Sequence, residues 1–167
     1  MNWSLLGIYL NDHLAGSVAG RELAKRCMSN NRGTPVGDYL ARLVDELAED
    51  QAAVRKLLRG LDVRPGRVKP ALGWAAEKVG RLKLNGQLTG YSPLSRLEEL
   101  EALYLGVEGK LRMWRALAHL QDAGPPVGRR DVQRLIRRAE AQLEGLERHR
   151  LWAAERVVPS PARPRTS

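Results

Sequence analysis

The segment PVGDYLARLVDELAEDQAAVRKLLRGL, residues 35–61, decides the fold class of this chain. Its apolar residues recur at intervals of three and four, which is the spacing of one face of an α-helix. The seam of this face reads Leu40, Leu43, Leu47, Asp50, Val54, Leu57 and Leu61. Thr34 before Pro35 supplies an N-cap hydroxyl, and a proline at the first helical position removes no intrahelical hydrogen bond. The segment therefore predicts a long amphipathic helix in which one carboxylate interrupts an aliphatic seam.

Three further segments carry the same helical spacing, over about residues 4–29, 93–121 and 129–157. Tight turns join the first pair and the last pair, whereas about thirty residues separate the pairs, which predicts an all-α four-helix bundle with one long crossover. Within the crossover, helical spacing of Val68, Leu72, Ala75 and Val79 predicts a shorter helix over about 68–83, followed by a loop, Lys83 to Tyr91. We expect one helical-bundle domain over 1–157 and a disordered Pro/Arg-rich tail over 158–167.

Composition supports one helical domain of 167 residues, because Phe is absent and aromatic residues make up only 5%. The apolar run from Trp3 to Leu10 is too short to span a membrane, and its flanks do not resemble a signal peptide. Cys27 is the single cysteine, which excludes an internal disulfide and suits a reducing compartment. The expected location is the cytoplasm.

Polar residues that interrupt the apolar seams are the candidates for chemistry. Counting back from the first turn places His13 level with Asp50, and Glu46 lies one turn from Asp50. If the second and third long helices are parallel, Asp50 also lies level with about Glu108. Three interpretations follow: a structural polar cluster that fixes helix register, a mononuclear Fe, Mn or Zn site built from His13, Glu46, Asp50 and Glu108, or a wrong register with some of these groups exposed.

The layout resembles the ferritin-like superfamily. The stretch from Trp74-Ala75-Ala76-Glu77-Lys78 through Leu97 also resembles a recurrent group of uncharacterised bacterial proteins. Di-iron members of the superfamily use a carboxylate from each of two helices and a Glu-x-x-His from each of the other two. In this chain the Glu-x-x-His motif is absent, and the fourth helix offers only Gln142 or Glu140. The resemblance therefore implies a ferritin-like fold with a degenerate metal site.

The chain is strongly basic, with a formal net charge of +9 at pH 7. On the predicted fourth helix, Arg130, Arg134, Arg137 and Arg138 fall on positions that face away from the core. Such a face could bind the phosphates of nucleic acid without reading sequence. Alternatively, Glu140 and Glu144 pair with these arginines at helical spacing and the face is only solvated.

No arrangement of nucleophile and base, and no cofactor-binding motif, can be placed in the sequence. The pattern favours a non-enzymatic structural or protein-interaction bundle without a cofactor, whose partner is another protein or a second copy of the chain. A divergent metal-binding protein and a nonspecific nucleic-acid or polyanion binder are the alternatives.

Overall fold

The computed structural model describes residues 3–62, 91–120 and 128–157, and this part of the chain is helical, without a strand. Its helices are α1 (Trp3–Asn30), α2 (Pro35–Gly60), α4 (Pro93–His119) and α5 (Arg129–Ala154). The predicted all-α class with four long helices is confirmed. The predicted short helix over 68–83, the predicted loop from Lys83 to residue 90 and the tail over 158–167 lie outside the described residues.

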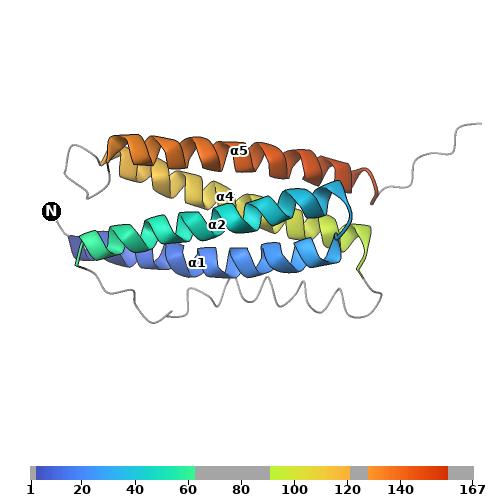
Figure 1. Cartoon of the computed structure of the whole chain (residues 1–167), viewed down its shortest axis with the longest axis horizontal. Helices are drawn as coiled ribbons and strands as arrows, with labels where there is room; N and C mark the ends of the chain where they lie inside the picture. Colours follow the sequence, from blue (N-terminus) through green and yellow to red (C-terminus); the bar gives the residue numbers. More distant parts are fainter. Residues whose placement is uncertain (1–2, 63–90, 121–127, 158–167) are drawn as a thin grey trace, which may run out of the picture.

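The helices form two antiparallel hairpins, α1–α2 and α4–α5, that lie along each other (Figure 1). Following the colours of the chain, α2 and α4 run in the same direction, which is the condition under which Asp50 is expected level with about Glu108 (Figure 1). The end of the bundle that holds the turn between α1 and α2 is called the turn end below, and the opposite end is called the far end. The turn end therefore contains the N-terminus of α4 and the C-terminus of α5, and the far end contains the N-terminus of α5 and the C-terminus of α2.

The caps predicted from two Thr/Ser-Pro pairs are present. Thr34 is the N-cap of α2, and its hydroxyl accepts a hydrogen bond from the Gly37 N–H at 3.2 Å. Ser92 caps α4 in the same way, accepting from the Ser95 N–H at 3.1 Å. In the turn between α1 and α2, Gly33 has a positive φ of 73°, a conformation that glycine adopts without strain. These local signals place both helix starts where the sequence predicts them.

An aliphatic core runs the length of the bundle. Burial of leucine and valine side chains supplies most of the stabilisation, at about 1.5–3 kcal/mol for each large apolar side chain. Trp114 on α4 is fully buried, as are Leu10, Leu40, Leu58 and Leu146 on the other three helices. None of the described helices is long and apolar enough to cross a membrane.

The helix pairs do not approach equally. Close backbone contacts are extensive within each hairpin and also present between α1 and α4, whereas the backbones of α2 and α5 approach closely at only a few positions. Near the turn end this contact depends on Gly145 of α5, because a Cβ there would lie 2.8 Å from the Cζ of Tyr39. Toward the middle of the bundle, long polar side chains span the distance between α2 and α5.

Candidate functional site: a central polar layer

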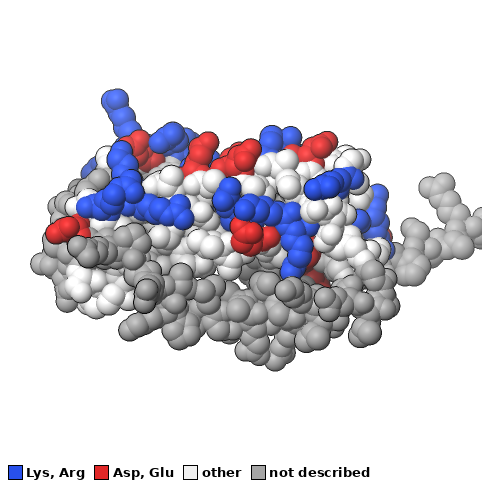
Figure 2. All heavy atoms as spheres, turned by 60° about the horizontal axis from the view of Figure 1, so that its bottom comes forward, with Lys and Arg blue, Asp and Glu red and all other residues white. Residues whose placement is uncertain are grey.

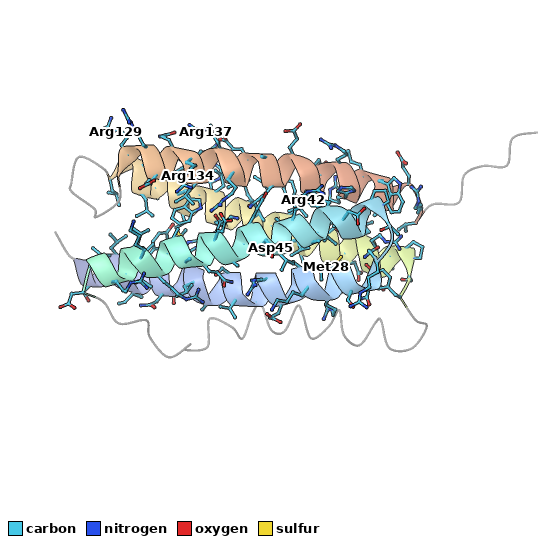
Figure 3. The ribbon with its side chains drawn as sticks, viewed as in Figure 1. Met28, Arg42, Asp45, Arg129, Arg134 and Arg137 are labelled. Atoms are coloured by element: carbon cyan, nitrogen blue, oxygen red, sulfur yellow. The ribbon has the colours of Figure 1, made fainter. Side chains whose placement is uncertain are left out.

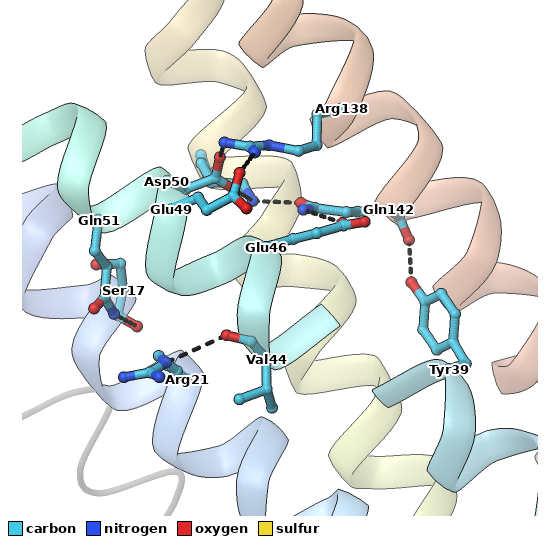
Figure 4. Close-up of polar contacts among 11 residues, drawn as sticks. Ser17, Arg21, Tyr39, Val44, Glu46, Glu49, Asp50, Gln51, Arg138 and Gln142 are labelled. Carbon is cyan, nitrogen blue, oxygen red and sulfur yellow. Dashed lines mark hydrogen bonds and ion pairs between the residues drawn. The ribbon is translucent and has the colours of Figure 1, made fainter. Parts of the chain in front are cut away.

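Asp50 is the centre of a buried polar layer between α2, α4 and α5. Its side chain is 3% exposed. One carboxylate oxygen accepts a hydrogen bond from the Lys110 Nζ of α4 at 2.5 Å, and the other accepts from the Arg138 guanidinium of α5 (Figure 4). A buried carboxylate is costly unless it is paired, and Asp50 is bound by two cations.

Lys110 is the cation that joins the three helices. Its Nζ donates to Asp50 on α2 and also to the Gln142 side-chain oxygen on α5. Burial lowers the pKa of Lys110, and the neighbouring Asp50 carboxylate opposes this shift. The ammonium group therefore fills the middle of the layer and is held by oxygen atoms from two sides.

Gln142 and Tyr39 extend the layer along the α2–α5 side. The Gln142 amide nitrogen donates to the Glu46 carboxylate at 2.7 Å, so that both ends of this amide are bonded. The Gln142 backbone carbonyl accepts from the Tyr39 hydroxyl at 2.8 Å (Figure 4). Because α5 bonds to α2 through these contacts, the layer also fixes how the two helices slide against each other.

Arg138 closes the layer from the solvent side. It reaches from α5 to α2, where it binds both Asp50 and the exposed Glu49 (Figure 4). Its side chain is only 19% exposed. This differs from the prediction that Arg138 faces solvent with the other arginines of the helix; a long side chain can bend back from a flanking position toward a buried carboxylate.

The predicted grouping of His13 and Glu108 with Asp50 is wrong, because both residues lie outside this layer. The His13 ring packs edge-to-face on Tyr9, with the ring centroids 4.6 Å apart. Glu108 is half-buried and pairs with Arg112 one turn along the same helix at 2.6 Å. Of the predicted set, only Asp50 and Glu46 come together, with Gln142 between Glu46 and Lys110.

The offset of His13 has a simple geometric cause. The Gln51 side chain donates to the Ser17 backbone carbonyl at 2.9 Å, which places Ser17 close to the level of Gln51 and Asp50. His13 is one helical turn farther toward the far end. Between α2 and α4, the predicted height along the bundle is closer to the observed one. Asp50 contacts Lys110, which is two residues from Glu108, the residue predicted to lie level with it.

Lys110 is not among the site residues predicted from the sequence. On α4, helical spacing relates a set of residues that are all buried, namely Leu100, Leu103, Val107, Lys110, Trp114 and Leu117. Leu111, next to Lys110, is buried as well, so the buried side of α4 is wider than one seam. A lysine at helical spacing with these apolar residues, opposite an aspartate, is the signal that could have found the layer.

The metal-ligand prediction finds no support in the geometry of the described part of the chain. Within residues 3–62, 91–120 and 128–157, no three His, Cys, Asp or Glu residues are grouped closely enough to hold a metal ion. Both oxygens of Asp50 are already bound by cationic side chains. The arrangement suits a structural ion-pair layer better than a coordination site.

A second polar cluster lies at the turn end and was not predicted. The buried Asn31 side chain donates to the Cys27 carbonyl and to the Tyr91 hydroxyl, each at 2.7 Å, and accepts from Arg96 at 2.5 Å. Tyr91 in turn donates to the buried Glu99. This end cluster ties α1 to the start of α4.

Glu99 and Cys27 complete the end cluster. Arg26 of α1 pairs with Glu99 at 2.9 Å. Burial raises the pKa of the Cys27 thiol to about 12, and the Glu99 charge adds to the effect. The thiol is therefore protonated at neutral pH, which makes it a packing group and a weak hydrogen-bond partner of Tyr91.

The remaining arginines of the predicted basic face are on the surface. Arg130, Arg134 and Arg137 are exposed on the first half of α5, and Figure 3 shows Arg137 pointing away from the bundle. Arg134 lies 3.5 Å from Asp131, with both side chains more than half exposed. On the face drawn in Figure 2, basic and acidic groups are interspersed.

No family model, no curated protein and no solved structure matches this chain.

Proposed function

We propose that this chain is a non-enzymatic, ferritin-like helical bundle that serves as a structural or partner-binding module in the cytoplasm. The central polar layer holds its helices in one register and carries out no reaction. The observation that carries this proposal is the position of Lys110, whose ammonium group is buried between Asp50 and Gln142. In a metal-binding bundle of this class, inward-facing carboxylates hold metal ions at the core; here a lysine supplies the positive charge.

The surroundings of the layer support the same role. Each charged group in it is matched within the bundle, since Asp50 binds two cations and the Gln142 amide bridges Lys110 and Glu46. A general acid or base needs access to a substrate proton, and a nucleophile needs an activating base. The Asp50 carboxylate is 3% exposed and fully engaged, so it suits neither role. An internally paired network of this kind specifies helix register, although the Arg138 Nε within it is buried without a hydrogen bond.

Metal loading tests this proposal against the divergent metal-protein alternative. The protein is expressed in metal-replete medium, loaded anaerobically with Fe(II) or Mn(II), or aerobically with Zn(II), desalted and analysed for metal content. We expect less than stoichiometric metal in the wild type and the same low content in Asp50→Ala. Asp45→Ala, which removes an exposed carboxylate from the same helix, is the matched control. Near-stoichiometric metal in the wild type and in Asp45→Ala, lost in Asp50→Ala, would contradict the proposal.

A further inference from the structure

The first half of α5 and the last turns of α2 concentrate positive charge at the far end of the bundle. From Arg129 to Glu140, α5 carries five arginines and two acidic residues. The close of α2 adds Arg55, Lys56 and Arg59. Both segments lie at the far end, where α2 ends and α5 begins (Figure 1). The topology therefore gathers basic residues that are seventy or more positions apart in sequence.

Several of these arginines are not used by the fold. Arg130 and Arg137 are exposed, and the contact between Arg134 and Asp131 is long and solvated, so its contribution is small. The second half of α5 differs, because Arg150 there binds Glu147 at 2.7 Å and also reaches Glu101. Arg130, Arg134 and Arg137 are thus available to a ligand, whereas Arg150 is committed to its own molecule.

The first turn of α5 holds Arg130 together with Asp131, so that the cationic charge there is only partly balanced within the isolated helix. The start of a helix carries a partial positive charge, so that cations in the first turn destabilise it slightly. Arg130 lies in this first turn, and α5 has no side-chain cap at Gly128. An anionic partner near the start of α5 would offset this cost, because phosphate groups are favoured at helix starts.

The chemistry around the arginines indicates the class of partner. Among the described residues, the exposed large apolar side chains are on α1, on α4, at Leu151 of α5 and at Val157 beyond the end of α5. Thus α2 and the first half of α5 offer none. Membrane surfaces are bound by basic residues combined with exposed apolar ones, and protein interfaces are anchored by buried apolar or aromatic side chains. A mainly basic, hydrated surface without exposed large apolar side chains instead suits a sugar–phosphate backbone.

We propose that the far-end surface, formed by Lys56, Arg59, Arg130, Arg134 and Arg137, binds the phosphate backbone of duplex nucleic acid without sequence preference. It has no recognition helix with base-reading side chains. The inference names a partner for the interaction role proposed above, but it depends on the outer surface and not on the central layer. The metal-loading experiment and the nucleic-acid-binding experiment can therefore contradict the two proposals independently of each other.

The test is fluorescence anisotropy with a labelled duplex DNA of about 25 base pairs, titrated from about 50 mM salt upward. The triple variant Arg130→Gln, Arg134→Gln and Arg137→Gln removes three charges from the far-end surface. Its matched control, Arg32→Gln, Arg42→Gln and Arg148→Gln, removes three exposed charges from the half of the bundle near the turn end. Circular dichroism confirms that both variants are folded, and the α5 substitutions relieve the unfavourable charge at the helix start.

We expect the wild type to bind with an affinity that falls steeply with salt, and the far-end triple variant to bind about tenfold more weakly or worse. The slope of log affinity against log salt should drop by about 2 to 3 in that variant and by less in the control. Absence of binding at low salt, or equal losses in the two variants, would overturn the proposal. Tighter binding to polyglutamate or to phosphatidylserine vesicles than to DNA would also overturn it.

Discussion

The central polar layer and the end cluster both bury a carboxylate, but they stabilise it in different ways. In the central layer, Asp50 is held by two full positive charges that come from two different helices. In the end cluster, Glu99 has one cation, Arg26, and shares the Tyr91 hydroxyl with the neutral Asn31. Losing one member of the central layer leaves unpaired buried charges, whereas losing the neutral Asn31 from the end cluster leaves mainly unsatisfied dipoles.

The two regions also join different parts of the bundle. The central layer connects α2 to both helices of the other hairpin, on the side where the backbones of α2 and α5 approach closely at only a few positions. The end cluster connects α1 to α4, whose backbones approach each other closely at more positions. The comparison therefore predicts that the bundle depends more on the central layer than on the end cluster.

The largest expected effect comes from removing the central carboxylate. Asp50→Ala leaves Lys110 and Arg138 without their buried partner, and we expect a loss of about 3–5 kcal/mol in the free energy of unfolding. Urea denaturation of the variant and of Asp45→Ala measures it, since Asp45 is exposed on the same helix. A loss in Asp50→Ala no larger than in Asp45→Ala would show that the layer does not support the fold.

A smaller effect is expected in the end cluster. Asn31→Ala removes the bonds that its side chain makes with the Cys27 carbonyl, Tyr91 and Arg96. The cost should be about 1–3 kcal/mol, because neutral groups and one half-exposed guanidinium lose their partner. The same denaturation experiment checks it, with the exposed Asn30→Ala as the control. If Asn31→Ala cost more than Asp50→Ala, the ranking of the two regions would be reversed.

The smallest effect separates the observed place of His13 from the predicted one. Burial lowers the pKa of His13, and Asp12 opposes the shift only in part. On acidification, His13 is therefore protonated at a higher pH in the unfolded chain than in the folded protein. The free energy of unfolding should fall as the pH drops below about 6.5. Had His13 paired with Asp50, its native pKa would be raised, and stability would fall as pH rises.

Thermal midpoints at about pH 7.5 and 5.5 measure this effect, by comparison of the wild type with His13→Gln. We expect a smaller decrease on acidification in the variant than in the wild type. His149, whose pKa is also lowered by burial, remains in both proteins and contributes equally. A larger decrease in His13→Gln would instead support the pairing with Asp50.

Much of the helical framework could be predicted from the sequence because its signals are local. Thr34-Pro35 and Ser92-Pro93 determine two helix starts through hydrogen bonds that span three residues. The leucine spacing of α2 identifies its buried face, including Asp50. The height of each residue along the bundle follows from the helical rise per residue. For this reason the residue of α4 predicted to lie level with Asp50, Glu108, is only two positions from its observed partner Lys110.

The partners within the site could not be predicted in the same way. The buried side of α4 is wider than one helical seam, so spacing alone does not decide whether Lys110 or Glu108 points inward. Arg138 reaches the layer through a long side chain whose end a helical wheel does not locate. The end cluster requires Tyr91 to meet Asn31, sixty residues earlier, and this depends on how the two hairpins dock.

The most direct test of the central claim is a double-mutant cycle on Asp50 and Lys110. Free energies of unfolding are measured for Asp50→Leu, Lys110→Met, the double variant and the wild type. If the lysine is the structural cation of the layer, each single variant is destabilised, and the double variant recovers at least about 1 kcal/mol relative to the sum of the two losses. Strictly additive losses would contradict the account, because they would mean that Asp50 and Lys110 do not stabilise each other.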